Sequence, residues 1–161
     1  MRSVLASIVC ALGLFSAALG RAAENPAVPA VKAVVRHQAE AISRLDVAAV
    51  KADWAPGGSI IDEFPPYFWQ GSAPFDLWWA TFQELAAKDK ITNLAAKIRG
   101  FQRVMVTGDR AYAVAEVAIT LKVDGKGYKQ SGLWTFVLGS VGGSWKVTAW
   151  GWSGQPIKSV K

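Results

Sequence analysis

The sequence has little of the chemistry on which many enzymes depend. Its 161 residues include one cysteine, one histidine and three tyrosines. One cysteine excludes a disulfide framework and a cysteine-based zinc site, and one histidine excludes a multi-histidine metal centre. No glycine-rich phosphate loop, metal-ligand cluster or nucleophile motif is present, so neither a metal nor a nucleotide cofactor is predicted. Hydrophobic residues make up 52% of the chain, which excludes a disordered protein, and the length suits a single domain.

The N-terminal residues have the pattern of a secretory signal peptide. Arg2 precedes an apolar run, and the small residues Gly20 and Ala22 suit cleavage after Ala22. An uncleaved membrane anchor is the alternative, although the run is near the lower length for spanning a bilayer. We predict a signal peptide over 1–22, a tether over 23–30, a domain over 31–153 and a tail over 154–161. The protein is then exported, periplasmic or extracellular, with no stable membrane anchor after cleavage.

Cleavage changes the charge and the thiol content of the chain. It removes Arg2, Arg21 and Cys10, which leaves 16 basic against 12 acidic residues, a net charge of +4, and no cysteine. A thiol-free chain suits an oxidising compartment. A charge this small and this dispersed does not predict nucleic-acid binding.

Two helical segments are expected in the first half of the domain. An apolar stripe without proline or glycine predicts a helix from about residue 30 to 51, with Asp46 marking a break. Residues 54–58 punctuate the chain and 59–64 form a short strand, which two prolines end. In the second helix, Ser72 is the expected N-cap and Pro74 lies in the first turn. Its large aromatic side chains share one face, and they are Phe75, Trp78, Trp79 and Phe82.

Four strands are expected in the second half. Alternation and turn residues place them over 92–107, 111–123, 128–138 and 145–153, with a bulge or bend at Gly100. Helices followed by an antiparallel meander form an α+β arrangement.

This order of elements resembles the nuclear transport factor 2-like superfamily, above all its SnoaL-like and ketosteroid-isomerase-like branches. The resemblance rests on Trp54, the strand at 60–65, Trp69-x-Gly71, Trp78 on the second helix, and strand segments at 132–138 and 143–147. It implies a cone-shaped, curved antiparallel β-sheet wrapped around N-terminal helices, a cystatin-like α+β barrel with an apolar pocket. Members include isomerases, cyclases, dehydratases, hydrolases and non-catalytic modules, so function must be argued from the site.

The resemblance also implies candidate catalytic residues. In the ketosteroid-isomerase branch an Asp at the end of the first strand removes a proton next to a carbonyl, and a Tyr and a protonated Asp bind the oxyanion. Here the base position falls on Glu63, with Asp62 beside it, and strand alternation predicts that only one of them faces the pocket. The donor positions fall near Gln38 and Trp134. Both side chains donate hydrogen bonds, but they do not complete the steroid isomerase set.

Each catalytic candidate also has a plainer interpretation. The acidic pair at 62–63 equally suits a solvated strand end. His37 lies at the edge of the helical apolar stripe, where it suits either an acid–base group or a surface residue.

The expected ligand-binding residues are mostly aromatic. They are Tyr67, Trp69, Trp78, Trp79 and Trp134, and core packing is the alternative for most of them. Glu116 is expected to form an ion pair with Arg99 or Arg103, or else Arg103 and Glu116 form a polar rim for an anionic substrate.

Alternation also places Trp150 and Trp152 together on one face of the last strand, opposite Trp145 and Val147. If Trp145 faces inward, the pair is exposed and forms the interface of a homodimer.

Two classes of function follow. One is an exported SnoaL-like protein whose aromatic pocket takes a small, largely apolar molecule, with cofactor-free acid–base catalysis as an isomerase, lyase or hydrolase. In this hypothesis Glu63 or Asp62 is the base and Gln38 or Trp134 the donor. The alternative is a non-catalytic ligand-binding or dimerising module.

Overall fold

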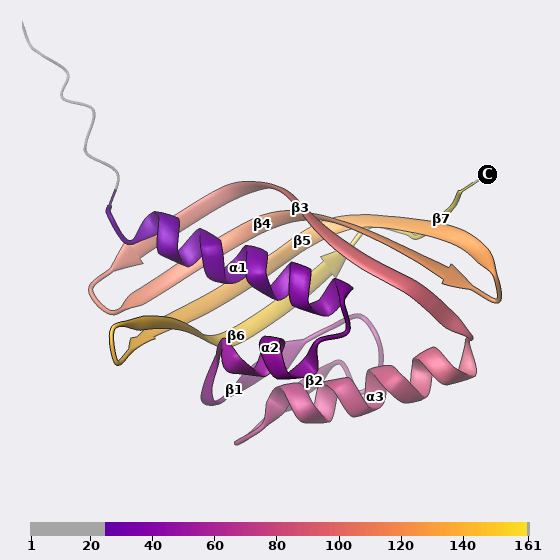
Figure 1. Ribbon diagram of the computed structural model, residues 1–161, viewed down its shortest axis with the longest axis horizontal. Coiled ribbons are helices and arrows are strands. Elements are labelled where there is room, and N and C mark those ends of the chain that lie inside the picture. The colour runs from indigo at the N-terminus through magenta and orange to yellow at the C-terminus, as the bar shows by residue number, and fades with distance from the viewer. Residues whose placement is uncertain (1–24, 161) are drawn as a thin grey trace, which may run out of the picture.

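The structure is a computed structural model that describes residues 25–160 (Figure 1). The predicted signal peptide over 1–22 lies outside the described residues. Helix α1 spans Val28–Ser43 and α2 spans Val47–Ala52. The Asp46 side chain caps α2 by accepting a hydrogen bond from the Ala49 N–H at 3.0 Å, which confirms the predicted break. No helix within the described residues is long and apolar enough to cross a membrane.

The remaining elements form one curved, unclosed sheet with a third helix beside it. The strands are β1 (Trp54–Ile61), β2 (Phe68–Gln70), β3 (Ile91–Thr107), β4 (Arg110–Val123), β5 (Lys126–Val141), β6 (Ser144–Gly154) and β7 (Lys158–Ser159), and helix α3 spans Pro74–Lys88. The order in the sheet is β2-β1-β6-β5-β4-β3, with β7 on β5. In Figure 1, α1 crosses the long strands, and α3 packs near β1, β2 and β3. The predicted α+β class is confirmed.

The sheet differs from the predicted meander at its first strand. β1 begins at Trp54 and pairs in parallel with β6, so residues 54–58 belong to the sheet rather than to a turn. A register shift between Trp54 and Ser59 accommodates Gly57 and Gly58. A Cβ on Gly58 would lie only 2.4 Å from the Thr148 carbonyl oxygen, so the close approach of β6 requires glycine there.

Helix α3 carries the predicted aromatic stripe but begins differently. Its N-cap is Ala73, which makes no side-chain cap, and Ser72 instead accepts a hydrogen bond from the Gly57 N–H through its carbonyl. The predicted N-cap at Ser72 is therefore wrong. Phe75 and Trp78 are buried on the inner face of the helix, as the stripe predicted.

The core lies between α1 and the concave face of the sheet. Val31 and Val35 of α1 are fully buried. They pack in a cluster with small side chains of β4, Ala113 and Ala115, which let the helix lie close to the strand. Burial of each valine stabilises the fold by roughly 1.5–3 kcal/mol.

A β-bulge in β6 decides where the C-terminal tryptophans point. Val137 of β5 pairs with Ala149, but Leu138 pairs with Val147, so Thr148 is an extra residue. The extra residue reverses the alternation, and Val147, Trp150 and Trp152 are all buried on the concave side. The prediction that Trp150 and Trp152 form an exposed patch is therefore wrong, because it assumed unbroken alternation.

Candidate active site

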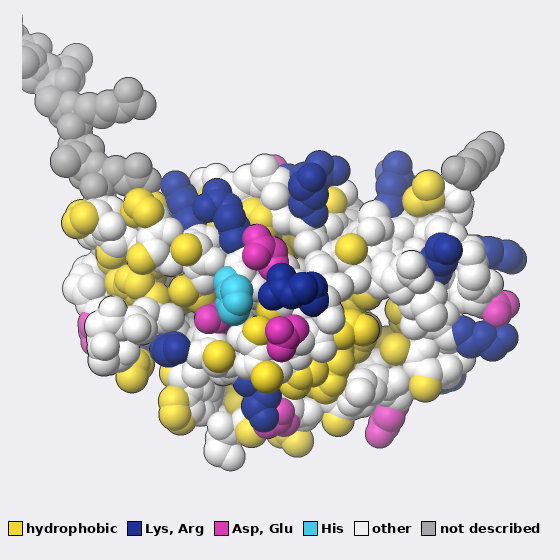
Figure 2. All heavy atoms as spheres, in the orientation of Figure 1, with side chains coloured by type: hydrophobic (Ala, Val, Ile, Leu, Met, Phe, Trp, Pro, Cys, Tyr) yellow, Lys and Arg dark blue, Asp and Glu magenta, His cyan; other side chains and the backbone are white. Residues whose placement is uncertain are grey.

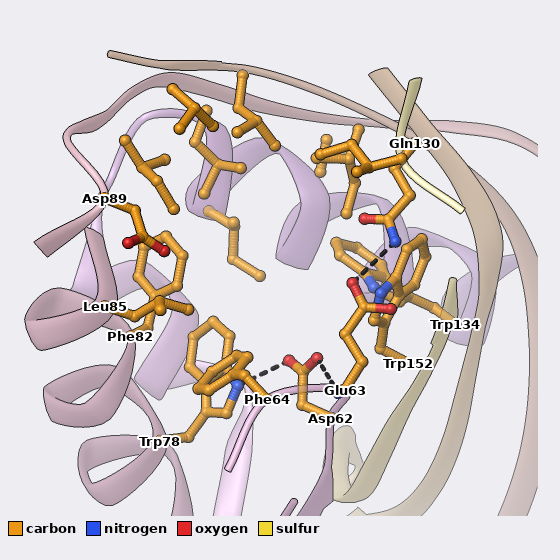
Figure 3. Close-up of a pocket in the computed structure, with 18 of the residues that line it drawn as sticks. Asp62, Glu63, Phe64, Trp78, Phe82, Leu85, Asp89, Gln130, Trp134 and Trp152 are labelled. Atoms are coloured by element: carbon orange, nitrogen blue, oxygen red, sulfur yellow. Dashed lines mark hydrogen bonds between the residues drawn. The ribbon is translucent and has the colours of Figure 1, made fainter. Parts of the chain in front are cut away.

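A cavity of about 270 Å³ lies at one end of the curved sheet, beside α3 (Figure 3). Its wall is mostly apolar. It is lined by Ile42, Asp62, Glu63, Phe64, Trp78, Phe82, Leu85, Asp89, Ile91, Leu94, Ala96, Ile119, Leu121, Val123, Gln130, Trp134, Trp150, Trp152 and Ile157. The volume is at the small end for ligand pockets, which suits a compact molecule.

Aromatic rings form the base of this wall. Trp78 stacks on Phe82 with ring centroids 5.6 Å apart and meets Trp150 edge to face at 5.0 Å. Trp134 also meets Trp150 edge to face, at 5.4 Å. Each of these rings is contacted by its neighbours, so the rings on the Asp62 side of the cavity are held in fixed positions.

Asp62 is the buried acid of the cavity, with only 8% of its surface exposed. One carboxylate oxygen accepts the Trp78 indole N–H at 2.8 Å, and the other accepts the Glu63 backbone N–H at 2.7 Å. Burial raises the pKa of Asp62 to about 6, against the opposing effect of these two hydrogen bonds. Asp62 is thus mostly ionised at neutral pH yet close to the range in which a carboxyl group exchanges protons.

Glu63 lines the same cavity, so the expectation that only one of the two acids faces it is wrong. β1 ends at Ile61, and both acids lie in the following turn, where strand alternation no longer applies. The Glu63 carboxylate accepts the Gln130 amide N–H at 2.8 Å, as Figure 3 shows. The absence of a side chain at Gly154 makes room for both groups, since a Cβ there would lie 2.6 Å from Glu63 Oε2.

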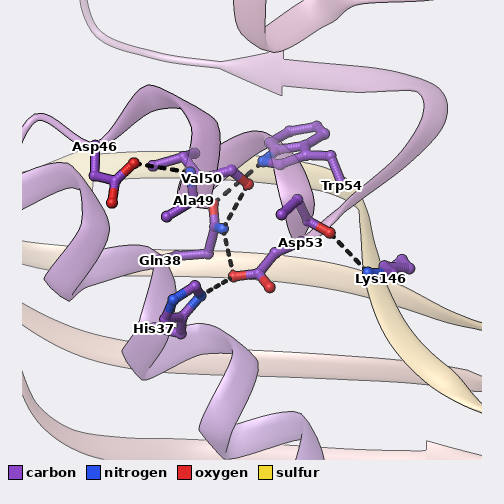
Figure 4. A network of polar contacts seen from close by, with 9 residues as sticks. His37, Gln38, Asp46, Ala49, Val50, Asp53, Trp54 and Lys146 are labelled. Carbon is purple, nitrogen blue, oxygen red and sulfur yellow. Dashed lines mark hydrogen bonds and ion pairs between the residues drawn. The ribbon is translucent and has the colours of Figure 1, made fainter.

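Gln38 and His37 belong to a separate polar network and do not line the cavity (Figure 4). The buried Gln38 amide donates to the Val50 carbonyl at 3.0 Å and to Asp53 Oδ2 at 2.9 Å, and its oxygen accepts the Trp54 N–H at 3.2 Å. Through these contacts Gln38 joins α1 to the start of β1. The expectation that Gln38 faces the pocket as a donor is therefore wrong.

His37 contacts the same aspartate from the surface. Its Nδ1 lies 2.6 Å from Asp53 Oδ2, and 43% of its side chain is exposed. Figure 2 shows the histidine in cyan on the surface of the molecule. This position fits the surface interpretation of the histidine rather than the acid–base one.

The predicted aromatic residues divide between the cavity and the packing around it. Trp78 and Trp134 lie in the cavity wall, whereas Tyr67 is exposed on a turn. Trp69 is buried in β2 and donates its N–H to the Thr81 hydroxyl at 3.2 Å. Trp79 packs on Phe75 at 6.1 Å, beside the cavity rather than in its wall.

Arg103 and Glu116 lie on the outer side of the sheet, away from the cavity. Glu116 accepts a hydrogen bond from the Gln102 amide at 3.2 Å, and no ion pair joins it to Arg99 or Arg103 in the described chain. Register shifts at Arg99 and at Gln102 leave Gly100, rather than an arginine, directly opposite Glu116. The predicted ion pair is therefore wrong, and the pair does not form a rim of this cavity.

Several polar side chains of the wall escaped the sequence reasoning. Gln130 and Asp89 carry no pattern that distinguishes them from surface residues. Trp150 was assigned to the wrong face, and its Nε1 is a buried donor for which the described residues offer no hydrogen-bond acceptor. Such a donor is costly to leave unsatisfied. Among the described residues, no group of three or more His, Cys, Asp and Glu side chains is placed to hold a metal ion.

Fold and site together define an α+β protein whose curved sheet and helices enclose an acid-bearing aromatic pocket. The sequence model of the SnoaL-like domain family matches residues 31–158, and the chain belongs to that family. No match was found among the curated protein sequences.

Solved structures of low sequence identity share this fold. A ketosteroid isomerase-like protein from Erwinia carotovora atroseptica is 19% identical with a TM-score of 0.66, over 82% of this chain and 99% of that one. A hexachlorocyclohexane dehydrochlorinase from Novosphingobium barchaimii is 11% identical with a TM-score of 0.69, over 82% and 88%. A nuclear transport factor 2-like protein from Salmonella enterica is 16% identical with a TM-score of 0.65, over 78% and 89%. At these identities the similarity shows the fold alone.

Proposed function

We propose that the protein binds a small, largely apolar molecule in this cavity and catalyses a cofactor-free proton transfer, as an isomerase, lyase or hydrolase. The observation that carries the proposal is the position of Asp62, a buried carboxyl group in an aromatic wall. A general base works best with a pKa near the working pH, and burial brings the pKa of Asp62 to about 6. Two of the solved structures with this fold carry names that agree with the proposal. One is named a dehydrochlorinase, which is a lyase, and the other is named ketosteroid isomerase-like.

The chemistry assigned to Asp62 is removal of a proton from a carbon next to a carbonyl. The C–H bond breaks, the proton goes to a carboxylate oxygen of Asp62, and the electron pair moves onto the carbonyl oxygen. The donor proposed for that oxygen is the indole N–H of Trp134, a residue of the cavity wall. In an isomerase the proton returns to a different carbon. In a lyase the electron pair from the broken C–H bond forms a C=C bond, and a leaving group on the adjacent carbon departs with the pair of its own bond.

Hydrogen–deuterium exchange tests this step without knowledge of the product. Small apolar ketones are incubated with the protein in D₂O, and loss of the proton next to the carbonyl is followed by NMR. Asp62→Asn is expected to lower the protein-catalysed exchange rate by about 10² to 10⁴. The neighbouring Glu63→Gln serves as the matched variant, with a smaller effect. Equal exchange rates in Asp62→Asn and the unchanged protein would remove Asp62 as the base.

A non-catalytic binding module is the second candidate, and one observation favours it. Both Asp62 oxygens are engaged by hydrogen bonds, and the Gln38 donor is committed elsewhere. This function predicts that ligands quench tryptophan fluorescence while the protein produces no exchange above the buffer rate.

We also propose that the protein is exported after removal of residues 1–22. The support is the sequence pattern of a short positive start, an apolar run and two small residues before the cleavage site. Intact mass measurement of the protein from the cell envelope is expected to show a chain beginning at Ala23. Ala22→Leu is expected to retain the leader, and a full-length mass for the unchanged protein would support the membrane anchor instead.

A further inference from the structure

The cavity carries charge of one sign only. Among residues 25–160, the ionisable residues that line it are Asp62, Glu63 and Asp89, and this described wall includes no lysine, arginine or histidine. This contrasts with the chain as a whole, which has 18 basic residues and a formal net charge of +6. The charged side chains of the cavity are therefore acidic, whereas the chain as a whole has a positive net charge.

These carboxyl groups are not neutralised by neighbouring cations. Asp62 and Glu63 receive hydrogen bonds from neutral donors, the Trp78 indole and the Gln130 amide. The ion pairs of the described chain lie elsewhere, and they join His37 to Asp53, Lys51 to Asp76, Lys90 to Asp124 and Arg110 to Asp109. Neutral donors hold a carboxylate in place without cancelling its field, so a cavity lined in this way attracts positive charge.

Asp89 lies between Lys88 and Lys90 in the sequence, and neither lysine is among the described residues that line the cavity. The partner of Lys90 also lies outside the cavity wall. The Lys90 ammonium group is held by Asp124 at a distance of 2.9 Å, on the turn between β4 and β5. Asp89 itself is exposed and lies across the cavity from Glu63 in Figure 3. A ligand in the space between them therefore lies between two carboxyl groups.

The walls between these acids are aromatic. The rings of Phe64, Trp78, Phe82, Trp134 and Trp150 line the cavity, and ring faces attract cations through their quadrupole. Rings combined with carboxylates are the means by which proteins bind ammonium groups that carry apolar substituents. A carboxylate or phosphate ligand, in contrast, meets repulsion, and the described residues of the wall include no basic group to compensate it.

We propose that this cavity selects a positively charged organic ligand, an amine or quaternary ammonium compound with a compact apolar body. The inference rests on the proposed function, because it names the class of molecule that the same site takes. It also replaces the anionic substrate expected from Arg103 and Glu116, which lie outside the cavity.

A matched pair of probes tests the charge preference directly. Phenyltrimethylammonium and tert-butylbenzene have nearly the same shape, and only the first is charged. Titrated by tryptophan fluorescence at low ionic strength, the cation is expected to bind at least 10-fold more tightly, and this preference is expected to fall as salt is added. Equal or tighter binding of tert-butylbenzene, or no binding of the cation, would overturn the proposal.

Variants locate the preference in the cavity. The double substitution Glu63→Gln with Asp89→Asn is expected to remove most of the preference while affinity for tert-butylbenzene changes little. Glu84→Gln, an exposed carboxyl on α3 outside the cavity wall, is the matched control and is expected to keep the preference. A preference unchanged in the double variant places the cation elsewhere and overturns the proposal.

The two proposals fail separately. Cation preference without exchange of ligand protons in D₂O would refute the proton transfer alone. Asp62-dependent exchange of neutral ketones without cation preference would refute the charge selection alone.

Discussion

The side chain of Asp62 combines two opposing influences that set its protonation. Burial in the aromatic wall disfavours the carboxylate, and the N–H groups of Trp78 and Glu63 stabilise it. Burial is the larger effect, so the pKa is raised from 3.8 to about 6. Ionisation of this residue therefore costs the folded protein stability at neutral pH, which is common for groups retained for function rather than for folding.

The pH dependence of stability is expected to show this cost. Between pH 3.8 and about 6 the folded state binds more protons at Asp62 than the unfolded state does, so stability falls as pH rises. Measured by urea unfolding, the unchanged protein is expected to lose about 2 kcal/mol relative to Asp62→Asn between pH 4 and pH 7. Glu84→Gln serves as the control on α3. Parallel stability curves for the Asp62→Asn variant and the unchanged protein would contradict the raised pKa.

The Trp78 indole is expected to hold the pKa of Asp62 lower than burial alone would set it. Trp78→Phe removes the donor to the charged carboxylate, so the pKa of Asp62 is expected to rise above its present value of about 6. NMR titration of the Asp62 carboxyl carbon measures the shift. Trp79→Phe makes the same change one residue further along α3, where the ring packs on Phe75 without contacting Asp62. A lower pKa in Trp78→Phe, or equal shifts in both variants, would count against this role.

At the scale of elements, the register between β1, β5 and β6 shapes the site. The extra residue Thr148 turns Trp150 and Trp152 inward, and its carbonyl oxygen lies against the backbone of Gly58. The bulge and the glycine are therefore coupled across neighbouring strands. A change at Gly58 acts on the cavity wall through β6, although Gly58 does not line the cavity.

Gly58→Ala is expected to destabilise the protein more than a comparable change in a turn. The new Cβ would meet the Thr148 oxygen at 2.4 Å, and φ at this position is +123°. The expected loss is about 3 kcal/mol by urea unfolding, together with altered tryptophan fluorescence. Gly142→Ala is the control, since φ is also positive there but open space surrounds the new Cβ, and about 1 kcal/mol is expected. Similar losses in both variants would show that β6 shifts without cost.

Elements with a strong local pattern were predictable, and those set by neighbouring strands were not. The α3 stripe and the break at Asp46 follow from spacing and capping within one segment of chain. The parallel pairing of β1 with β6 brings together residues far apart in sequence, and no local pattern reports it. The same reason explains the wrong prediction for Gln38. Comparison with the family predicted that its side chain is a hydrogen-bond donor in the pocket, but contacts with Val50, Asp53 and Trp54 hold it elsewhere.

At the scale of the whole molecule, the outer face of the sheet carries the exposed apolar surface that Trp150 and Trp152 were expected to provide. Met105, Tyr112 and Val137 are paired across β3, β4 and β5 and are all exposed. Ile61 on β1 extends the same face and is 57% exposed. A row of this kind is typical of an interface with another protein.

We expect a second copy of the chain to cover this row. Val137→Lys is expected to shift the protein toward monomer in sedimentation equilibrium, because it places a charge in the centre of the apolar row. Leu77→Lys, at an exposed position on α3, is the control and is expected to leave the association unchanged. A protein that is monomeric at all concentrations, or equally affected by both variants, would contradict this dimer.

The sequence by itself determined the composition, the helices, the four long strands and the family resemblance, because these depend on the spacing of residues along one segment. It also placed two acids at the end of the first strand. Only the tertiary structure decided that both acids enter the cavity, that Asp62 is the buried one, and that the C-terminal tryptophans turn inward. Those outcomes depend on the end of β1, on the bulge at Thr148 and on which groups exclude water from a carboxyl, and each arises from contacts between segments distant in the chain.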